Sequence, residues 1–260
     1  AFPMSLIHTW LPAATPDSNN PLQIIAAEGP YLYTRDGQKL YDAISSWWCK
    51  PLGHRHPLVK ESLEAQLKIF EHHLPANAYN ATIEQLSTLL VGIFTQMDKV
   101  IYASDGSSAI EIAMKLSYET RVLQGEAERC KYLALSGAYH GETIFTLGVC
   151  GIANYTRNYQ ALISQNLFIQ DVVYVDSPQD PAWDNAPFDS DKMEHFFNQH
   201  ASQITALLIE PVVQGAAGLK IISRDYLCKL INLARAHGIH IIADEIMVGL
   251  GRLGYFSVSK

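Results

Sequence analysis

The sequence predicts an α/β protein in which a largely parallel β-sheet is covered by helices on both faces. Short apolar runs alternate with stretches that carry apolar residues at helical spacing, and polar or glycine-rich segments follow several of the runs. The expected strands are residues 100–103, 132–135, 172–175, 206–209 and 239–243. The expected helices are residues 57–70, 82–94, 107–123, 189–200 and 224–237. Nearer the amino terminus, residues 31–43 are typical of a hairpin with its turn at Asp36-Gly37.

Composition excludes several functional classes. With 48% hydrophobic and 17% charged residues and a formal net charge of -7, the chain has no basic stripe for a nucleic acid. No apolar run approaches the roughly 20 residues that a membrane-spanning helix needs. The four cysteines are far apart, and the neighbouring histidine pairs have no acidic or cysteine partners, so we expect no metal site. A cytoplasmic protein with reduced thiols is the expectation.

The run that says most about chemistry is residues 238–252, in which a buried strand is followed by Asp244, Glu245 and then glycines. Ligands of open α/β sheets bind beyond the carboxyl ends of the strands, where a carboxylate can hold a positive charge on a ligand. The alternative is that Asp244 only caps a turn. The local pattern leaves both interpretations open.

A second candidate is the loop Gly106-Ser107-Ser108, between an expected strand and an expected helix. The backbone N–H groups and the positive end of the helix dipole make such a junction an anion site that suits a phosphate. The alternative is that Ser107 or Ser108 merely caps the helix. The loop lacks the glycine spacing of dinucleotide-binding and nucleotide P-loop motifs, which argues against simple dehydrogenases and ATPases.

Three further segments offer aromatic or ionisable side chains. Tyr139 and His140 follow a strand, where the ring of Tyr139 is suited to stack on a flat ligand and His140 is either a base or structural. Glu210 ends another strand before Pro211, which predicts a place in or behind the crevice. Trp47 and Trp48 either wall an apolar substrate pocket or fill the core, and taken alone they favour the core.

In this order, the segments Ser-Ser-Trp-Trp, Asp-Gly-Ser-Ser, Tyr-His-Gly, Ile-Glu-Pro-x-x-Gln-Gly and Ala-Asp-Glu-Ile followed by Gly-x-Gly-Arg resemble the class III aminotransferases. These are fold type I enzymes that use pyridoxal 5′-phosphate (PLP), and the ordered set is far more specific than any one segment. The resemblance runs from about Trp10 to the last residues and is strongest to the biotin-pathway branch. It implies that residues 1–50 belong to a small domain and residues 51–260 to the large PLP-binding domain.

The resemblance also implies roles for individual residues. Asp244 would pair with the protonated pyridine nitrogen, and Tyr139 would stack on the ring with His140 beside it. The cofactor phosphate would lie at the helix start, and Trp48 would line the substrate pocket. Glu210 and Arg252 would be supporting or substrate-side residues. The phosphate-binding residues would be Gly106, Ser107 and Ser108.

The reaction implied is amino transfer from a small-molecule donor to a keto acceptor. In the biotin-pathway branch these are S-adenosylmethionine and 8-amino-7-oxononanoate, and the enzymes are homodimers. The family's Schiff-base lysine lies a few dozen residues after the motif aspartate, and Lys260 does not match its context. We therefore expect this chain to be the amino-terminal part of a longer enzyme, inactive by itself.

Two departures weaken the substrate assignment, while Met247 favours the biotin branch over enzymes that carry glutamine there. Ala13 stands where a substrate-contacting tyrosine is usual, and Glu142 replaces the aspartate expected after Tyr-His-Gly. The competing hypotheses are an aminotransferase of another omega-amino acid and a non-catalytic fragment that retains the fold for binding or assembly.

Overall fold

The computed structural model describes residue 11 and residues 21–259, which fall into two compact units, residues 1–79 and 80–260. The domain boundary expected at residue 50 remains a prediction. The first unit contains a three-stranded antiparallel sheet in the order β1-β2-β3. These strands are Ile24–Glu28, Tyr31–Thr34 and Lys39–Tyr41, and the hairpin predicted around Asp36-Gly37 is confirmed as the β2–β3 pair.

Three helices follow these strands along the chain, two in the first unit and one at the start of the second. They are α1 (Ser45–Trp48), α2 (Pro57–Leu67) and α3 (Ala81–Ile93), of which α3 begins the second unit. All four residues of α1 have φ values between 48° and 66°, so α1 is a single left-handed turn. Trp47 is 68% exposed and Trp48 is half-buried, so the core position favoured for these rings is wrong.

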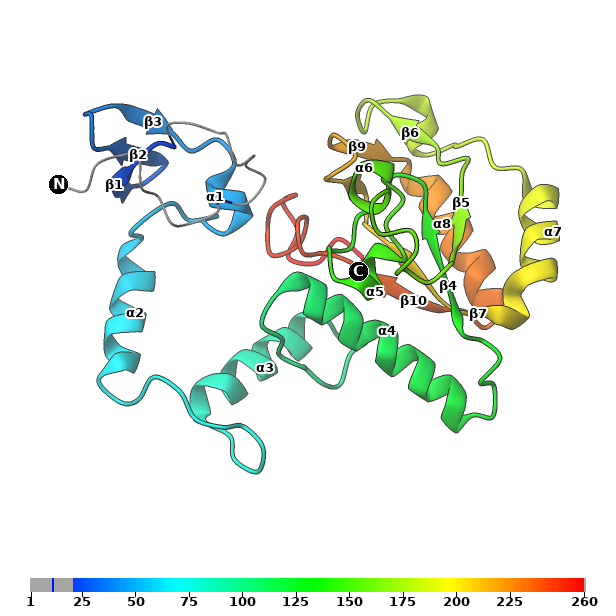
Figure 1. Ribbon diagram of the computed structural model, residues 1–260, viewed down its shortest axis with the longest axis horizontal. Coiled ribbons are helices and arrows are strands. Elements are labelled where there is room, and N and C mark those ends of the chain that lie inside the picture. Colours follow the sequence, from blue (N-terminus) through cyan, green and yellow to red (C-terminus); the bar gives the residue numbers. More distant parts are fainter. Residues whose placement is uncertain (1–10, 12–20, 260) are drawn as a thin grey trace. The chain divides into compact units, whose positions relative to one another are not determined.

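The second unit is built on a parallel sheet in the order β10-β7-β4-β5 (Figure 1). Every residue of β7 is buried, as expected for a central strand covered on both faces. The strands are β4 (Lys131–Leu135), β5 (Leu167–Ile169), β7 (Ile204–Ile209) and β10 (His240–Ala243). This parallel arrangement confirms the α/β fold predicted from the alternating pattern.

Helices cover this sheet on two sides, with α4 on one side and α7 and α8 on the other (Figure 1). The α4 helix contacts β7 and β10, and α8 contacts β10. Phe197 of α7 stacks on His237 at the end of α8, which joins these two helices. Their bounds are α4 (Gly106–Leu123), α7 (Ser190–His200) and α8 (Arg224–Ala236), close to the ranges predicted from the sequence.

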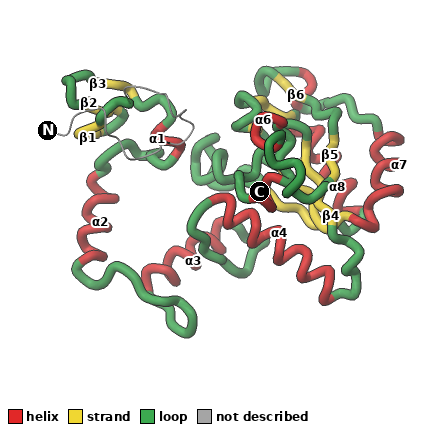
Figure 2. Tube along the Cα trace, viewed as in Figure 1, coloured by secondary structure: helices red, strands yellow, loops and turns green. Residues whose placement is uncertain are grey.

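Smaller elements lie around the main sheet (Figure 2). A second sheet is antiparallel, in the order β6-β9-β8, with strands Tyr174–Val175, Lys220–Ile222 and Val213–Gln214. The short helices are α5 (Ile144–Leu147), α6 (Ala153–Thr156), η1 (Pro181–Trp183) and η2 (Ala201–Gln203). Within the described residues, no helix is both long and apolar enough to cross a membrane.

Two of the predicted strands require correction. Residues 100–103 form no strand, since none of the described strands pairs with them. Ile101 and Tyr102 are exposed there, and the Tyr102 hydroxyl bonds to the α3 residue Ser87. The segment predicted at 172–175 forms only the two residues of β6, and it pairs antiparallel with β9 outside the main sheet. Apolar composition alone did not reveal which runs find a parallel partner, and β5 was not predicted.

Candidate active site

Three neighbouring strands of the main sheet deliver polar residues to the same edge. Because β4, β7 and β10 are parallel, their carboxyl ends coincide. His140 follows β4 by a short turn, Glu210 follows β7 directly, and Asp244 follows β10 directly. All three are buried, at 2%, 7% and 8% exposed respectively. The arrangement that the sequence predicted for these strand ends is present in the fold.

Asp244 is held from both of its carboxylate oxygens. Oδ2 lies 2.9 Å from Nδ1 of His140, and Oδ1 accepts a 3.1 Å hydrogen bond from the backbone N–H of Ile246. Its own backbone N–H donates to the carbonyl of Ile209, which extends the β10–β7 pairing. Asp244 therefore does what both earlier interpretations required, since it organises the following turn and also presents a fixed carboxylate at the strand end.

Glu210 ties the turn after β4 to the segment after β7. Its two carboxylate oxygens accept the backbone N–H groups of Tyr139 at 3.0 Å and Gly215 at 3.1 Å. Burial raises the pKa of Glu210 to about 7, against the lowering effect of His140 and of the two N–H donors. Glu210 thus lies behind Tyr139 as a support, in agreement with its predicted position.

Tyr139 is fixed at both ends of its side chain. Its hydroxyl donates to a carboxylate oxygen of Glu142 at 2.8 Å, and its ring centroid lies 5.0 Å from that of Tyr155. Burial and the hydrogen bond to Glu142 raise the pKa of Tyr139, so the phenol stays protonated at neutral pH. Sequence reasoning did not identify Tyr155, because its distance along the chain from Tyr139 gives no periodic signal.

The start of α4 packs directly against this cluster. A Cβ placed on Gly141 would lie 2.3 Å from Oγ of Ser107, and Gly141 has φ +118°, which side chains rarely adopt. A Cβ on Gly106 would lie 2.9 Å from the side chain of Ile246, two residues after Asp244. The serine-bearing helix start, the Tyr139 turn and the Asp244 strand end are therefore brought together.

At the start of α4, the interpretation that Ser107 or Ser108 caps the helix is wrong. The residue that caps α4 is Asp105, whose carboxylate accepts from the N–H of Ser108 at 2.9 Å and from its hydroxyl at 2.7 Å. Neither Ser107 nor Ser108 is the cap, because Asp105 is the residue before the first helical residue and its carboxylate accepts the N–H of Ser108. Ser108 is engaged by Asp105, which leaves Gly106 and Ser107 as the residues facing the cluster.

Gln214, which the sequence singles out only within the Ile-Glu-Pro-x-x-Gln-Gly motif, also lies near this cluster. Gln214 is fully buried, accepts from the Tyr174 hydroxyl at 2.6 Å and donates to the carbonyl of Ser136 at 3.1 Å. It thereby fixes the segment after β7 against the segment after β4. The Gln-Gly pair of the Ile-Glu-Pro motif was the available sequence signal.

The remaining predicted residues are placed differently. Arg252 lies in the exposed loop after Asp244, within the same unit as the cluster. Trp48 belongs to the first unit, which is described by itself, and Ala13 lies outside the described residues. Their substrate-side roles remain predictions. Among the described residues, no group of three or more histidine, cysteine or acidic side chains is arranged to hold a metal ion.

This combination of sheet, helix start and buried aspartate is found in a known family. Residues 13–260 match the aminotransferase class-III family, and the chain belongs to it. It is 34% identical over 256 residues to the adenosylmethionine-8-amino-7-oxononanoate aminotransferase of Helicobacter pylori, covering 96% of this chain and 56% of that protein. For the same enzyme of Nitratidesulfovibrio vulgaris the identity is 30%, with 97% and 46% covered.

Solved structures agree on the fold. A PLP-bound amine transaminase from an uncultivated Pseudomonas species superposes with a TM-score of 0.87 at 28% identity, covering 99% of this chain and 60% of that chain. The adenosylmethionine-8-amino-7-oxononanoate aminotransferase of Methanocaldococcus jannaschii gives a TM-score of 0.85 at 26% identity, with 96% and 55% covered. The fold type I class predicted from the sequence is confirmed. The chain spans about half the length of the curated relatives that it matches.

Proposed function

We propose that the protein to which this chain belongs is a PLP-dependent aminotransferase that moves an amino group from S-adenosylmethionine to 8-amino-7-oxononanoate in biotin synthesis. The observation that carries the proposal is the His140–Asp244 pair, buried where three parallel strands end beside the start of α4. Family membership and relatives named for this reaction, at 30% and 34% identity, support it.

The residues at the cluster fit PLP by shape and by charge. His140 Nε2 is buried and has no hydrogen-bond partner among the described residues, so His140 has capacity beyond its bond to Asp244. The contact of Gly141 with Ser107 leaves no room for a side chain between the helix start and the Tyr139 turn. A flat ring with a phosphate at one end and a protonated nitrogen at the other matches the helix start and Asp244 respectively.

When bound, PLP supplies a cationic ring that withdraws electrons from the carbon bearing the transferred amino group. Asp244, which is bonded to His140, would hold the proton on the ring nitrogen through a charge-assisted hydrogen bond. Tyr139 would lie against the ring. Gly106 and Ser107 would bind the phosphate at the positive end of α4, with Ser108 acting through its bonds to Asp105.

The lysine that carries the cofactor in this family is proposed to lie outside these 260 residues, which would then not transaminate by themselves. We also place Trp48 and Arg252 on the substrate side, and propose a cytoplasmic homodimer. Light scattering on the intact protein, meaning the product of the gene that encodes this chain, tests the dimer.

A second candidate is amino transfer between other omega-amines and keto acids. The observation that favours it is the TM-score of 0.87 to an amine transaminase, together with Glu142 in place of the expected aspartate. Substrate assays on the intact protein loaded with PLP separate the candidates. Amino transfer from S-adenosylmethionine to 8-amino-7-oxononanoate supports the proposal. Activity only with omega-amino acids supports the second candidate, and PLP binding without any transfer supports a binding role.

A further inference from the structure

The carboxylate of Glu245, the residue after Asp244, is the acceptor for a segment twelve to fourteen positions further along the chain. Oε2 accepts the N–H of Val258 at 2.9 Å, and Oε1 accepts the N–H of Ser259 at 2.9 Å. The hydroxyl of Ser257 donates to Oε1 at 3.2 Å, and the hydroxyl of Ser259 also donates to it. One side chain therefore closes the loop formed by residues 246–256 by joining its two ends.

The loop that Glu245 closes is in contact with the candidate active site at its first residue. Ile246 donates its N–H to Asp244 and packs against Gly106 at the start of α4. Further along, the N–H groups of Leu250 and Gly251 donate to the carbonyls of Phe256 and Tyr255, so the loop folds back on itself. Backbone bonds thus order the far part of the loop, and the Glu245 side chain joins its two ends.

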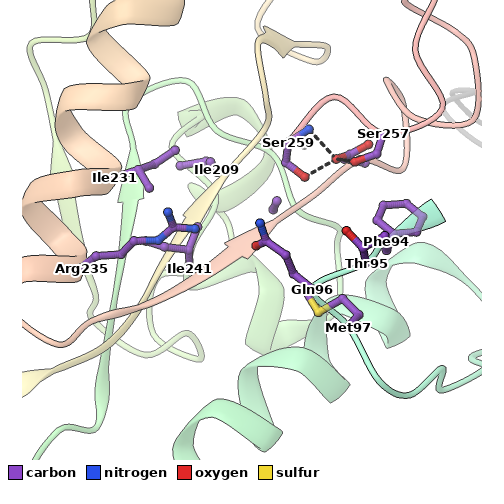
Figure 3. Close-up of a pocket in the computed structure, with 12 residues that line it drawn as sticks. Phe94, Thr95, Gln96, Met97, Ile209, Ile231, Arg235, Ile241, Ser257 and Ser259 are labelled. Atoms are coloured by element: carbon purple, nitrogen blue, oxygen red, sulfur yellow. Dashed lines mark hydrogen bonds between the residues drawn. The ribbon is translucent and has the colours of Figure 1, made fainter. Parts of the chain in front are cut away.

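Besides these bonds, the anchored segment is held by the burial of Ser257 and by the backbone bonds of Phe256 and Tyr255 within the loop. Ser257 and Ser259 line a cavity of about 330 Å³ that also involves Ile231 and Arg235 of α8 and residues 94–97 (Figure 3). Ser259 is exposed, so the packing of its side chain contributes little to holding the end of this segment. The dashed lines at Ser259 in Figure 3 mark its backbone and hydroxyl hydrogen bonds, whose acceptor is the Glu245 carboxylate. A charged acceptor makes such bonds stronger than a neutral one would.

The turn after Glu245 is also shaped around this side chain. Gly249 donates its N–H to the carbonyl of Glu245 at 2.8 Å. A Cβ on Gly249 would lie 2.9 Å from that carbonyl oxygen and 3.1 Å from Oε2 of the carboxylate. The backbone of the loop thus passes close to the carboxylate at a residue without a side chain.

We propose that Glu245 is a positioning residue that fixes the 246–256 loop beside the Asp244 site and thereby sets the affinity for the amino-group acceptor. This inference rests on the proposed function. The bonds of Asp244 to His140 and to the carbonyl of Ile209 do not involve the Glu245 side chain, so cofactor binding is expected to change little. Loss of the Glu245 carboxylate is expected to change substrate binding and the order of the loop.

The test uses Glu245→Ala and Glu245→Gln in the intact protein, with Glu194→Gln as the control. Glu194 is an exposed acid of α7 that pairs with His237 and makes no bond to the described segment 246–259. Glu245→Ala removes all the acceptors, whereas Glu245→Gln retains one oxygen. We expect Glu245→Ala to raise the KM for the keto acceptor about tenfold with kcat within about twofold, and Glu245→Gln to have a smaller effect. Glu194→Gln leaves both constants unchanged.

Hydrogen exchange of the peptide covering residues 246–259, followed by mass spectrometry, reads the loop independently of activity. We expect faster exchange there in Glu245→Ala, a smaller change in Glu245→Gln and no change in Glu194→Gln, with the PLP dissociation constant unchanged.

Unaltered exchange, or a fall in kcat with KM unaltered, would overturn the inference. If the unsubstituted protein shows no amino transfer but the exchange pattern holds, the proposed function fails while the anchoring role of Glu245 stands. If Glu245→Ala does not fold, Glu245→Gln decides by the same readouts.

Discussion

At the residue scale, the three acids at the strand ends have different hydrogen-bond partners and therefore different tasks. Asp244 is bonded to His140, while Glu210 accepts two backbone N–H groups and has a pKa raised by burial to about 7. Glu245 accepts from the segment that closes the next loop. The sequence shows three carboxylates at strand ends. Only their hydrogen-bond partners, which the fold reveals, distinguish a role toward a ligand from a role in supporting the backbone.

The raised pKa of Glu210 predicts a pH-dependent stability. The folded state keeps a proton on Glu210 that the unfolded chain releases above its ordinary pKa of 4.5, so stability is complete below that pH and is lost as the pH rises through about 7. At about 1.4 kcal/mol per pKa unit, the loss approaches roughly 3 kcal/mol. We expect Glu210→Gln to remove this loss between pH 5 and pH 8.

The measurement is the free energy of unfolding of the cofactor-free protein by urea at several pH values. The control is Glu194→Gln, because that acid is exposed. Its pH profile should follow that of the unsubstituted protein. A profile for Glu210→Gln that falls as steeply as that of the unsubstituted protein would show that Glu210 does not bind the extra proton.

At the scale of elements, the site depends on how closely α4 approaches the turn after β4. Gly141 is the point of contact, with φ +118° and Ser107 where its Cβ would be. We expect Gly141→Ala to lower the free energy of unfolding by more than about 2 kcal/mol, because backbone strain and a clash act together. It should also weaken PLP binding, since the helix start must move.

Gly125 provides a matched control for this substitution. It also has a positive φ, +79°, but no atom lies within 4 Å of its Cβ position. Gly125→Ala should therefore cost only the strain, about 1 kcal/mol, and leave PLP affinity unchanged. Equal effects of the two substitutions on PLP binding, read by titrating absorbance, would contradict the packing of α4 on this turn.

Particular elements show why some features follow from sequence and others do not. The strand-end positions of Asp244, Glu210 and His140 follow from alternating patterns, because parallel strands end at one edge whatever the side chains contact. Residues 100–103 have the same apolar character, but no strand pairs with them. The clamp from Glu245 to residues 257–259 is non-local and has no periodicity, so only the fold reveals it.

At the scale of the whole molecule, a buried arginine joins several segments of the 80–260 unit. Arg129 donates to the carbonyls of Ile204, Ala201 and His237, at 3.1, 3.1 and 2.8 Å. These carbonyls lie at the start of β7, in η2 and after α8, so one side chain joins three segments. Arg129→Met should cost about 3 kcal/mol, because the carbonyls lose charged donors.

The control is Arg224→Met. Arg224 forms an exposed ion pair with Asp184, and such pairs contribute about 0–1 kcal/mol. Both variants are compared by urea unfolding of the intact protein. A loss of stability in Arg129→Met no larger than in Arg224→Met would show that the bonds of Arg129 are dispensable for the fold.

The role proposed for Asp244 is to keep the pyridine nitrogen of bound PLP protonated. The direct measurement is the ¹⁵N NMR shift of PLP labelled at that nitrogen, bound to the intact protein and to its Asp244→Ala variant. We predict the shift of a protonated nitrogen in the unsubstituted protein and that of an unprotonated nitrogen in Asp244→Ala. An identical shift in both proteins, or failure of the unsubstituted protein to bind PLP, would contradict the account.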